Sequence, residues 1–453
     1  MSSQETVKEL PVPPDTAVEV FDGESFQAGR VWRIPWVGAV TSDQAREYLP
    51  TIATEFAVIV AQIVAFKLAA HYLGPEGFSE YAVARRAASL ISALPLLGLA
   101  VGLPRYIAYS NGRGDSQATV RYYGAALRCV GIAMILCLIV LNGLRSQIAF
   151  LIFGDRVYAG LILPVSLMVL GLALHGIVYS YFRGHLAMMR ANLLQVVNLA
   201  VVPIVCFTTL HQSTRTLVLS LGSAWFLVAF VGLWFTPVGG VTAQTPDETR
   251  ELLRYGIQRL PGEFALMAML SLPVIFVAHR SGVQQAGFVA FGISVLSMIG
   301  AFFTPIGLIL LPKASALLAD GRRHELRVHV ALLIRVSLAV AGVATVLVWF
   351  LARPFVALYL GSGFEDAGSL LRLIVLGAVP YALFTVLRNL IDAFHRDAVT
   401  AVIAISGLAV FILGAWLGKG YFPVGEEVLI AFLVGLGTLG FAAWFECGRI
   451  LRT

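Results

Sequence analysis

The sequence predicts an all-α protein that crosses a membrane about twelve times, in two pseudo-symmetric six-helix bundles around a central cavity. Three observations lead to this prediction: the hydropathy, the length of the apolar runs and an internal repeat. Hydrophobic residues make up 58% of the 453 and charged residues 13%, and the mean hydropathy is +0.83. Soluble domains are about half apolar and a quarter charged. Apolar runs of about 20 residues, enough to span a bilayer, recur from Pro50 to Cys447.

The apolar runs place the membrane helices in two series. The first series covers residues 50–72, 81–108, 120–144, 160–180, 191–210 and 216–236. The second covers residues 253–279, 286–312, 326–351, 367–390, 397–418 and 426–447. The four cysteines lie inside these runs without metal-ligand or disulfide spacing, so we expect them to pack as small apolar groups: Cys129, Cys137, Cys206 and Cys447.

The remaining segments are polar. Residues 1–49 are expected to form a mostly disordered cytoplasmic tail, in which Arg30 to Val40 either lies at the membrane interface or is unstructured. Residues 237–252 are the expected cytoplasmic linker between the two series, and residues 448–453 a short cytoplasmic tail.

The basic residues predict the orientation in the membrane. One set of connections, together with the C-terminus, carries fourteen Lys or Arg, and the alternate set carries six. The richer set should be cytoplasmic, which places both termini inside a multi-pass protein of the cell's inner (cytoplasmic) membrane. The net charge of +6 is then a property of the loops, and no nucleic-acid partner is expected.

An internal repeat relates the two series. Ala70-His71 matches Ala278-His279 at a separation of 278 − 70 = 208 positions. Other collinear matches, all separated by 206–210 positions, are Glu55-Phe56 with Glu263-Phe264, Pro95 with Pro305, Pro104-Arg105 with Pro312-Lys313, Arg128 with Arg335, and Arg190 with Arg396. Residues 50–236 and 253–447 therefore read as two copies in one orientation, related by an axis along the membrane normal. Such a pair forms either an alternating-access transporter or an inert scaffold. Prolines inside the apolar runs can kink their helices. Such kinks either take part in a movement or are static, so the prolines are compatible with a transporter and with a scaffold.

One corner of the first copy carries a family resemblance. The segment from Tyr72 to Ala108, which begins "YLGPEGFSEYAVARRA" and ends "GLAVGLPRYIA", resembles the polysaccharide and O-antigen flippases. These belong to the multidrug/oligosaccharidyl-lipid/polysaccharide superfamily. The matching positions are Leu73, Gly74, Pro75, Glu76, Phe78 and Tyr81. The sequence departs from the family at His71, Ser79, His279 and the Arg85-Arg86 pair. The resemblance implies export of a lipid-diphosphate-linked oligosaccharide from the cytoplasmic to the outer leaflet.

Basic residues within or near the apolar runs are candidates for the substrate diphosphate. A bare charge at the centre of a bilayer costs on the order of 3 kcal/mol, and an Arg fork donates two parallel hydrogen bonds to a phosphate. The candidates for such a cationic cavity are Lys67, Arg85, Arg86, Arg105, Arg259 and Arg280. The alternatives are that Lys67, Arg85 and Arg86 extend to the headgroups and that Arg105 only sets the topology.

Two intramembrane carboxylates occupy equivalent places in the repeat. Glu55 and Glu263 are candidates for binding H⁺ or Na⁺ as the coupling ion, because an intramembrane carboxylate marks a functional site by default. The alternative for Glu263 is an ion pair with Arg259, four residues earlier on the same helix face. His71 and His279, near the outer helix ends, are candidates for a pH-sensitive switch or for an interfacial structural role.

No catalytic, metal-binding or nucleotide-binding constellation is found in the sequence, so we expect a transporter and not an enzyme, with no cofactor beyond a coupling ion. The expected partners are the lipid-linked oligosaccharide, membrane lipids and polysaccharide polymerase or export proteins, and the protein is expected to be a monomer. The rival functions are a multidrug or cation exporter of the same superfamily, a lipid II flippase, and a membrane glycan polymerase or ligase.

Overall fold

This computed structural model describes residues 42–237, 246–303, 323–394 and 398–452. The chain divides into two compact units, residues 1–46 and residues 47–453, and the architecture below is that of the second unit. Every regular element among the described residues is a helix, as the sequence predicts. The stretch from Arg30 to Val40, and Pro305, Pro312, Lys313 and Arg396 of the repeat, lie outside the described residues.

The helices fall into two series in chain order. We define the first half as α1 (Ser42–Leu96), α2 (Leu99–Gly112), α3 (Ser116–Gly143), α4 (Arg145–Phe153), η1 (Arg156–Leu161), α5 (Ile162–Gly184), α6 (Met188–Val196), η2 (Val197–Val201), α7 (Val202–Thr209) and α8 (Thr214–Leu233). We define the second half as α9 (Pro246–Ala301), α11 (Arg323–Tyr359), α12 (Glu365–Val375), α13 (Ala378–Phe394), α14 (Val399–Leu417) and α15 (Glu426–Arg452).

The longest helix of each half reverses direction at a glycine. In α1 the reversal is at Gly74, whose φ is 66°, and in α9 it is at Gly282, whose φ is 86°. Both values lie in the left-handed region that glycine enters without steric cost. The two glycines are 282 − 74 = 208 positions apart, so the repeated corner of the sequence is a repeated turn of the chain. Each reversal divides its helix into a first and a second arm.

The number of membrane crossings agrees with the sequence. Nine described helices are long and apolar enough to cross a membrane, and the pair α12 and α13, bent by 50°, makes a tenth crossing. Because α1 and α9 each reverse, they cross twice, which brings the described crossings to twelve. The predicted helix 81–108 is not continuous, however: Leu97 (φ 53°) and Gly98 (φ 71°) separate α1 from α2.

The polar linker of the sequence analysis is shorter than predicted, because α9 begins at Pro246. The first three turns of α9 pack on α2 and α3 of the first half. Gly98 and Gly256 meet there so closely that a Cβ at Gly98 would lie 2.3 Å from the Gly256 carbonyl oxygen. Two glycines thus allow α9 to cross from the first half into the second.

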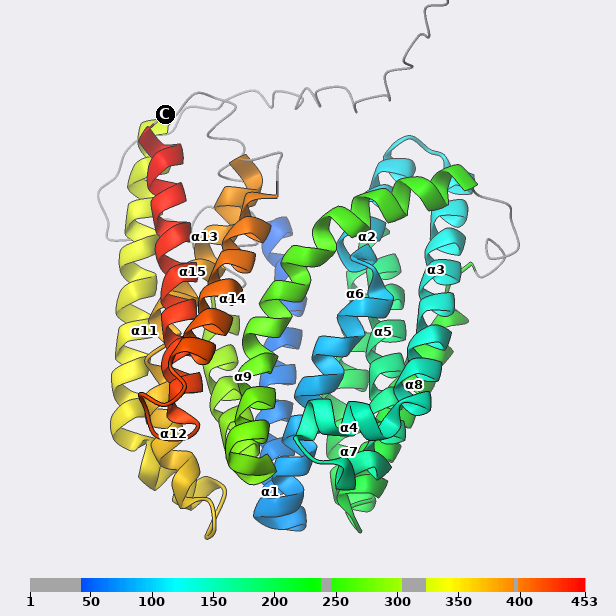
Figure 1. Ribbon diagram of the computed structural model, residues 1–453. Helices are drawn as coiled ribbons and strands as arrows, with labels where there is room; N and C mark the ends of the chain where they lie inside the picture. Colours follow the sequence, from blue (N-terminus) through cyan, green and yellow to red (C-terminus); the bar gives the residue numbers. More distant parts are fainter. Residues whose placement is uncertain (1–41, 238–245, 304–322, 395–397, 453) are drawn as a thin grey trace, which may run out of the picture. The chain divides into compact units, whose positions relative to one another are not determined.

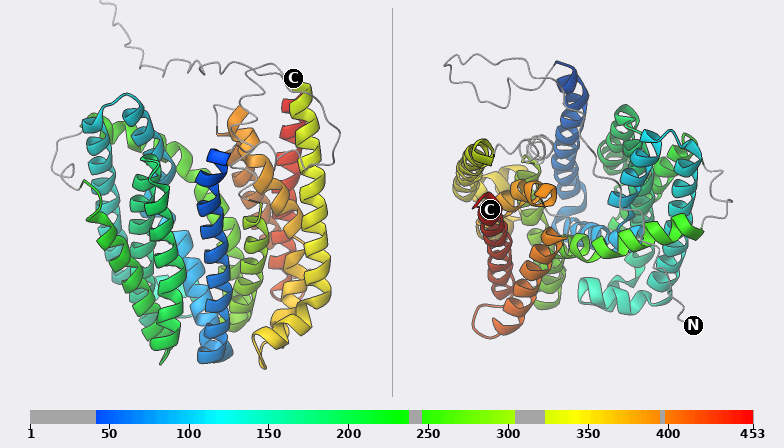
Figure 2. Two further views of the ribbon diagram at one scale, coloured as in Figure 1. Left: turned by 180° about the vertical axis from the view of Figure 1, so that it is seen from behind. Right: turned by 90° about the horizontal axis from the view of Figure 1, so that it is seen from above.

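The two halves lie side by side. α1 of the first half and α9 of the second half lie in the middle, between the remaining helices of the two halves. Figures 1 and 2 show α2 to α8 gathered on one side of these two helices and α11 to α15 on the other. We call the end of the bundle that carries Gly74 and Gly282 the turn end. The opposite end, which carries Gly98, Arg121 and Pro246, is the linker end.

Candidate functional site

A polar cavity of about 250 Å³ lies between the two halves, where α1 faces the second arm of α9. Both arms of α1 contribute to it. Its lining residues are Glu55, Val58, Ile59, Gln62, Arg85, Arg86, Ser89, Ser294, Ser297, Met298 and Ala301. Three sequence-predicted residues, Glu55, Arg85 and Arg86, therefore come together in one site, and polar groups of the second half complete it.

The two arginines lie deep in the bundle. The second arm of α1 starts directly after Gly74, so Arg86 lies roughly 16 Å along the helix from Pro75, at 1.5 Å per residue. That depth is about half of a hydrocarbon layer of about 30 Å. Arg86 is half-buried, and its Nη2 donates a hydrogen bond of 2.7 Å to Ser294 Oγ across the interface between the halves.

Arg85 is held by an aromatic ring. Its guanidinium carbon lies 5.4 Å from the centroid of the Phe66 ring on the first arm of α1, a cation–π contact. Ser89 Oγ donates to the Arg85 carbonyl oxygen at 3.0 Å. Although neighbours on a helix point about 100° apart, both arginines line the cavity, because its walls come from both arms of α1.

Glu55 contacts an amide that the sequence analysis missed. Gln195 Nε2 of α6 donates to Glu55 Oε1 at 3.0 Å. One turn further along, Asn198 Nδ2 lies 3.1 Å from Nδ1 of the buried His175. Asn198 belongs to η2, a π-helical turn between α6 and α7. Insertions of this kind inside α-helices are frequent at functional sites.

Two oxygen atoms of this amide group have no hydrogen-bond partner in the described part of the chain. They are Gln195 Oε1 and Asn198 Oδ1, both buried. Buried polar atoms normally have partners, and hard cations prefer oxygen ligands. The group of Glu55, Gln195 and Asn198 therefore has the donor chemistry of a small-cation or proton site. The signal in the sequence was "NLLQVVN", with polar residues at i, i+3 and i+6 of an apolar run.

An apolar cavity of about 510 Å³ adjoins the polar one. The two share Ser294 and Met298. The apolar cavity is lined by Ile63 and Phe66 of α1, by Phe291, Ser294, Val295, Met298, Ile299, Phe302 and Phe303 in and after α9, and by Val340, Ala344, Phe355 and Tyr359 of α11. The site is therefore amphipathic, with two guanidinium groups beside an apolar wall.

The second half contains a smaller cavity of about 200 Å³ that shares Ser297 and Ala301 with the polar one. Tyr381 and Arg388 of α13 line it. Glu263 is half-buried on the first arm of α9 but is not among the lining residues of the cavities described here. The repeat thus places Glu55 and Glu263 at equivalent chain positions in different surroundings.

Two further predicted residues meet at the linker end. The guanidinium carbons of Arg105 and Arg259 lie 5.4 Å and 4.9 Å from the centroid of the Tyr255 ring, and Arg105 also donates to Tyr255 Oη at 3.3 Å. This Arg–Tyr–Arg group joins α2 to α9, away from the polar cavity.

The other four predicted residues lie at the turn end, where three of them join helices. Lys67 Nζ donates to the Tyr359 carbonyl oxygen, which closes the end of α11 against α1. His279 Nε2 lies 2.9 Å from the Leu151 carbonyl oxygen of α4, so it joins the two halves. Arg280 pairs with the buried Glu427 within the second half at 3.9 Å, and His71 is exposed against Tyr72. None of these four lines the polar cavity.

The halves are also packed together at the turn end by apolar contacts. Phe78 contacts Phe364 at a ring-centroid distance of 5.2 Å, and Phe66 contacts Phe291 at 5.8 Å. Gly287 faces Ser79, where a Cβ would lie 2.3 Å from Ser79 Cα. The turn end is therefore closed between these residues.

We expect Gly287→Val to open the turn end. The added side chain overlaps the Ser79 backbone, and overpacking of this kind costs about 1–3 kcal/mol, which shifts the population away from the closed form. Spin labels on cysteines introduced at Gln212 and Glu365, one in each half, should report a longer distance in this variant. The native cysteines are replaced by alanine beforehand. The matched control is Gly342→Val, because a Cβ at Gly342 meets nothing within 4 Å; an unchanged distance for Gly287→Val contradicts the prediction.

Two protein-family models match the chain. One is described as "Polysaccharide biosynthesis protein" and matches residues 48–318; the other is MatE and matches residues 260–417. A relative from Geobacillus kaustophilus, named "Probable multidrug resistance protein NorM", is 34% identical over 217 residues. That match covers 45% of this chain and 47% of the relative, so the chain matches about half of the relative's length.

Several solved transporters share the fold. An inward-facing multidrug resistance MATE family transporter of the MOP superfamily gives a TM-score of 0.70 at 14% identity, over 87% of this chain and 96% of that chain. A eukaryotic MATE transporter gives 0.63 at 16% identity, over 90% and 96%. The Vibrio cholerae MATE transporter VcmN gives 0.60 at 17% identity, over 91% and 98%. These likenesses establish a twelve-crossing transporter fold in two bundles.

Proposed function

Because this chain belongs to the polysaccharide biosynthesis protein family, a branch of a transporter superfamily, we propose that it is a flippase for a lipid-diphosphate-linked oligosaccharide. It moves this lipid from the cytoplasmic to the outer leaflet, for surface polysaccharide biosynthesis. The observation that carries the proposal is the pair of adjoining cavities, one with Arg85 and Arg86 and the other apolar.

The chemistry of the substrate matches this arrangement in two respects. A diphosphate requires cationic donors inside the membrane, where a guanidinium fork forms charge-assisted hydrogen bonds. The attached lipid requires an apolar surface beside those donors, which residues such as Phe66, Met298 and Phe355 supply. A soluble anion has no need of the second cavity.

The substrate is moved by a rocking motion of the two halves relative to each other. The substrate enters between α1 and α9 from one side, and the halves then rock so that the cavity opens to the other. The contacts of Lys67, His279 and Gly287 hold the turn end closed in this form. With both termini in the cytoplasm, as the basic residues predict, the turn end faces outward and the form described here is the one that receives substrate.

The energy comes from an ion gradient in this proposal, and Glu55 is the coupling group. Binding of H⁺ or Na⁺ at Glu55 changes the charge of a cavity that also holds Arg85 and Arg86. Ion and diphosphate thereby influence each other's binding, and such coupling is reciprocal. Glu263, which lies outside the polar cavity, has no part in this step.

The test uses a strain that lacks its own flippase for a defined lipid-linked repeat unit. Expression of this protein should restore surface polysaccharide and lower the amount of lipid-linked repeat in the cytoplasmic leaflet. If several repeat units are tried and none reaches the surface although the protein is in the membrane, the proposal is contradicted.

A multidrug exporter is the second candidate, because a carboxylate also lines the cavity and a relative is named as a multidrug resistance protein. Under this alternative, the protein raises the resistance of a drug-sensitive strain to lipophilic cations. We expect no change in resistance, since two arginines and one glutamate give the cavity a net positive charge that disfavours a cation.

A further inference from the structure

A second cationic cavity lies at the linker end, outside the site described above. It has a volume of about 910 Å³ and is formed between α3 and the first turns of α9. Its lining residues are Arg128, Cys129 and Ile132 of α3, and Pro246, Thr249, Arg250, Leu253 and Arg254 of α9. We propose that this cavity binds the phosphate headgroup of an anionic phospholipid from the leaflet that meets the linker end.

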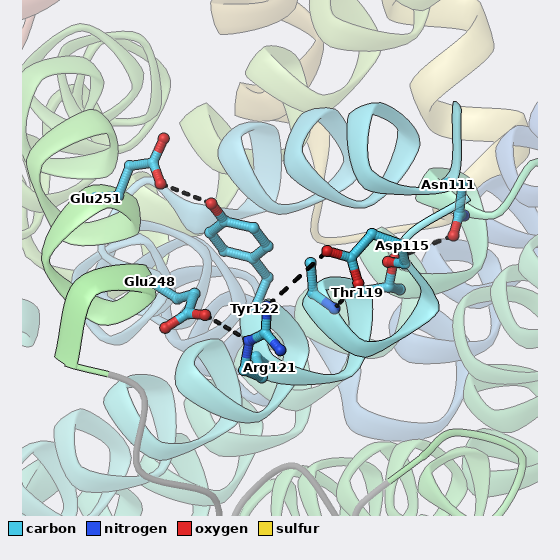
Figure 3. A network of polar contacts seen from close by, with 8 residues as sticks. Asn111, Asp115, Thr119, Arg121, Tyr122, Glu248 and Glu251 are labelled. Carbon is cyan, nitrogen blue, oxygen red and sulfur yellow. Dashed lines mark hydrogen bonds and ion pairs between the residues drawn. The ribbon is translucent and has the colours of Figure 1, made fainter. Parts of the chain in front are cut away.

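The first turns of α9 carry acidic and basic side chains on neighbouring sides of the helix. Figure 3 shows Glu248 and Glu251 of α9 pointing toward Arg121 and Tyr122 of α3. Arg121 Nε donates to Glu248 Oε1 at 2.6 Å, and Tyr122 Oη donates to Glu251 Oε2 at 2.6 Å. These contacts fix the segment against α3 and direct its carboxylates to the start of that helix.

The neighbouring side of α9 presents arginines to the cavity. Arg250 and Arg254 are four residues apart and so share one face of α9. Both are exposed, and neither has a carboxylate within 4.0 Å in the described ranges. Arg128 lies two turns beyond Arg121 on α3 and completes the set. Three guanidinium groups around one cavity are suited to a phosphate, which they bind through bidentate, charge-assisted hydrogen bonds.

The surface beyond the cavity identifies the ligand as a lipid. Ile132 lines the cavity and begins a stripe on α3 with Ile135, Leu136 and Ile139, whose side chains are 57–62% exposed. Their spacing places them on one helix face. α3 has 28 residues, roughly 42 Å at 1.5 Å per residue, whereas the hydrocarbon layer is about 30 Å thick. About 12 Å of α3 therefore extends beyond the hydrocarbon layer. With this excess at the linker end, Arg128, roughly 18 Å from the start of α3, lies about 6 Å inside the layer, and its long side chain extends to the headgroups. An acyl chain can continue along the stripe.

The proposed phospholipid site includes α9, the helix that packs on the first half and continues into the second. A phospholipid bound by Arg128 on α3 and by Arg250 and Arg254 on α9 holds these two helices together at the linker end. Basic pockets between membrane helices are a recurrent form of anionic lipid recognition. Binding should therefore stabilise the packing of α9 on the first half.

The experiment uses the purified full chain in detergent and native mass spectrometry. Phosphatidylglycerol is added to the wild type, to Arg250→Gln/Arg254→Gln, to Arg250→Lys/Arg254→Lys and to the control Arg113→Gln/Arg190→Gln. The control removes two exposed arginines from the same end of the first half, neither of which lines the cavity. We expect the glutamine pair to weaken phosphatidylglycerol binding by about tenfold or more, given two lost surface arginines. The control should stay close to the wild type. The lysine pair keeps the charge but removes the planar fork, so we expect it to show an intermediate loss.

Two comparisons identify the ligand class. Phosphatidylcholine should bind at least about tenfold more weakly than phosphatidylglycerol, because the cavity attracts net negative charge, and excess inorganic pyrophosphate should not displace phosphatidylglycerol. Displacement by pyrophosphate shows a free-anion site and overturns the lipid assignment. Equal loss in the control variant, or no loss in the glutamine pair, overturns the cavity as the site.

Discussion

Replacing Arg85 and Arg86 together by glutamine is expected to lower export of the lipid-linked oligosaccharide by about 100-fold or more. A hydrogen bond to a charged group contributes about 1.5–3 kcal/mol, and each arginine supplies at least one to the diphosphate. The loss of both amounts to about 3 kcal/mol or more, and each 1.4 kcal/mol is a factor of ten. Quantification of surface polysaccharide in a flippase-deficient strain measures the effect.

Two controls separate the role of the charge from that of the fold. Arg145→Gln/Arg215→Gln removes two exposed arginines from the turn end and should leave export unchanged. Arg85→Lys/Arg86→Lys keeps the charge but removes the planar fork, so we expect an intermediate loss. If Arg85→Gln/Arg86→Gln exports the oligosaccharide at nearly the wild-type level, these arginines only anchor α1 and the prediction is wrong.

Replacing Glu55 by glutamine is expected to uncouple transport from the ion gradient. Glutamine keeps a hydrogen bond to Gln195 and much of the side-chain volume, but it neither takes up a proton nor carries a charge for Na⁺. Gradient-driven accumulation of substrate in proteoliposomes should fall more than about tenfold, the equivalent of 1.4 kcal/mol. Exchange of substrate without a gradient should remain.

Glu263→Gln is the matched control for this prediction. Glu263 occupies the equivalent position of the repeat, but it lies outside the polar cavity. We expect this variant to stay coupled. If Glu263→Gln loses the gradient dependence and Glu55→Gln retains it, the assignment of the coupling group is wrong.

The sequence predicted the features that depend on local chemistry and on the repeat. The match of Ala70-His71 with Ala278-His279 at 208 positions marked a repeated corner. The structure shows that each of these corners turns at a left-handed glycine, Gly74 and Gly282. The apolar runs predicted the crossings, since a membrane span requires about 20 apolar residues wherever it occurs.

The features that depend on long-range packing were not predictable in this way. The pairing of Arg280 with Glu427 joins residues 147 positions apart (427 − 280), so Arg280 was predicted as a candidate for the substrate diphosphate. Pro246 to Leu252 read as a polar linker, because the acidic and basic groups that make that segment polar find their partner helix only in the fold. The predicted helix began at residue 81 and so placed Arg86 near a helix end, whereas the second arm of α1 continues back to the turn at Gly74.

The sequence analysis missed the amides near Glu55 for a third reason. Gln195 and Asn198 are each unremarkable in an apolar helix, and the role of Gln195 comes from a carboxylate 140 positions earlier (195 − 55). A systematic search for polar residues at helical spacing within apolar runs identifies this group from the sequence alone.

The most direct test of the account is a flipping assay with purified protein in liposomes. A fluorescent lipid-diphosphate oligosaccharide is placed in both leaflets, and its accessibility to a membrane-impermeant quencher is followed after an ion gradient is imposed. We predict that the wild type moves the lipid between leaflets, whereas Arg85→Gln/Arg86→Gln leaves its distribution unchanged. Equal rates of movement in the two proteins, or none in the wild type, would contradict a cationic cavity that transports the diphosphate.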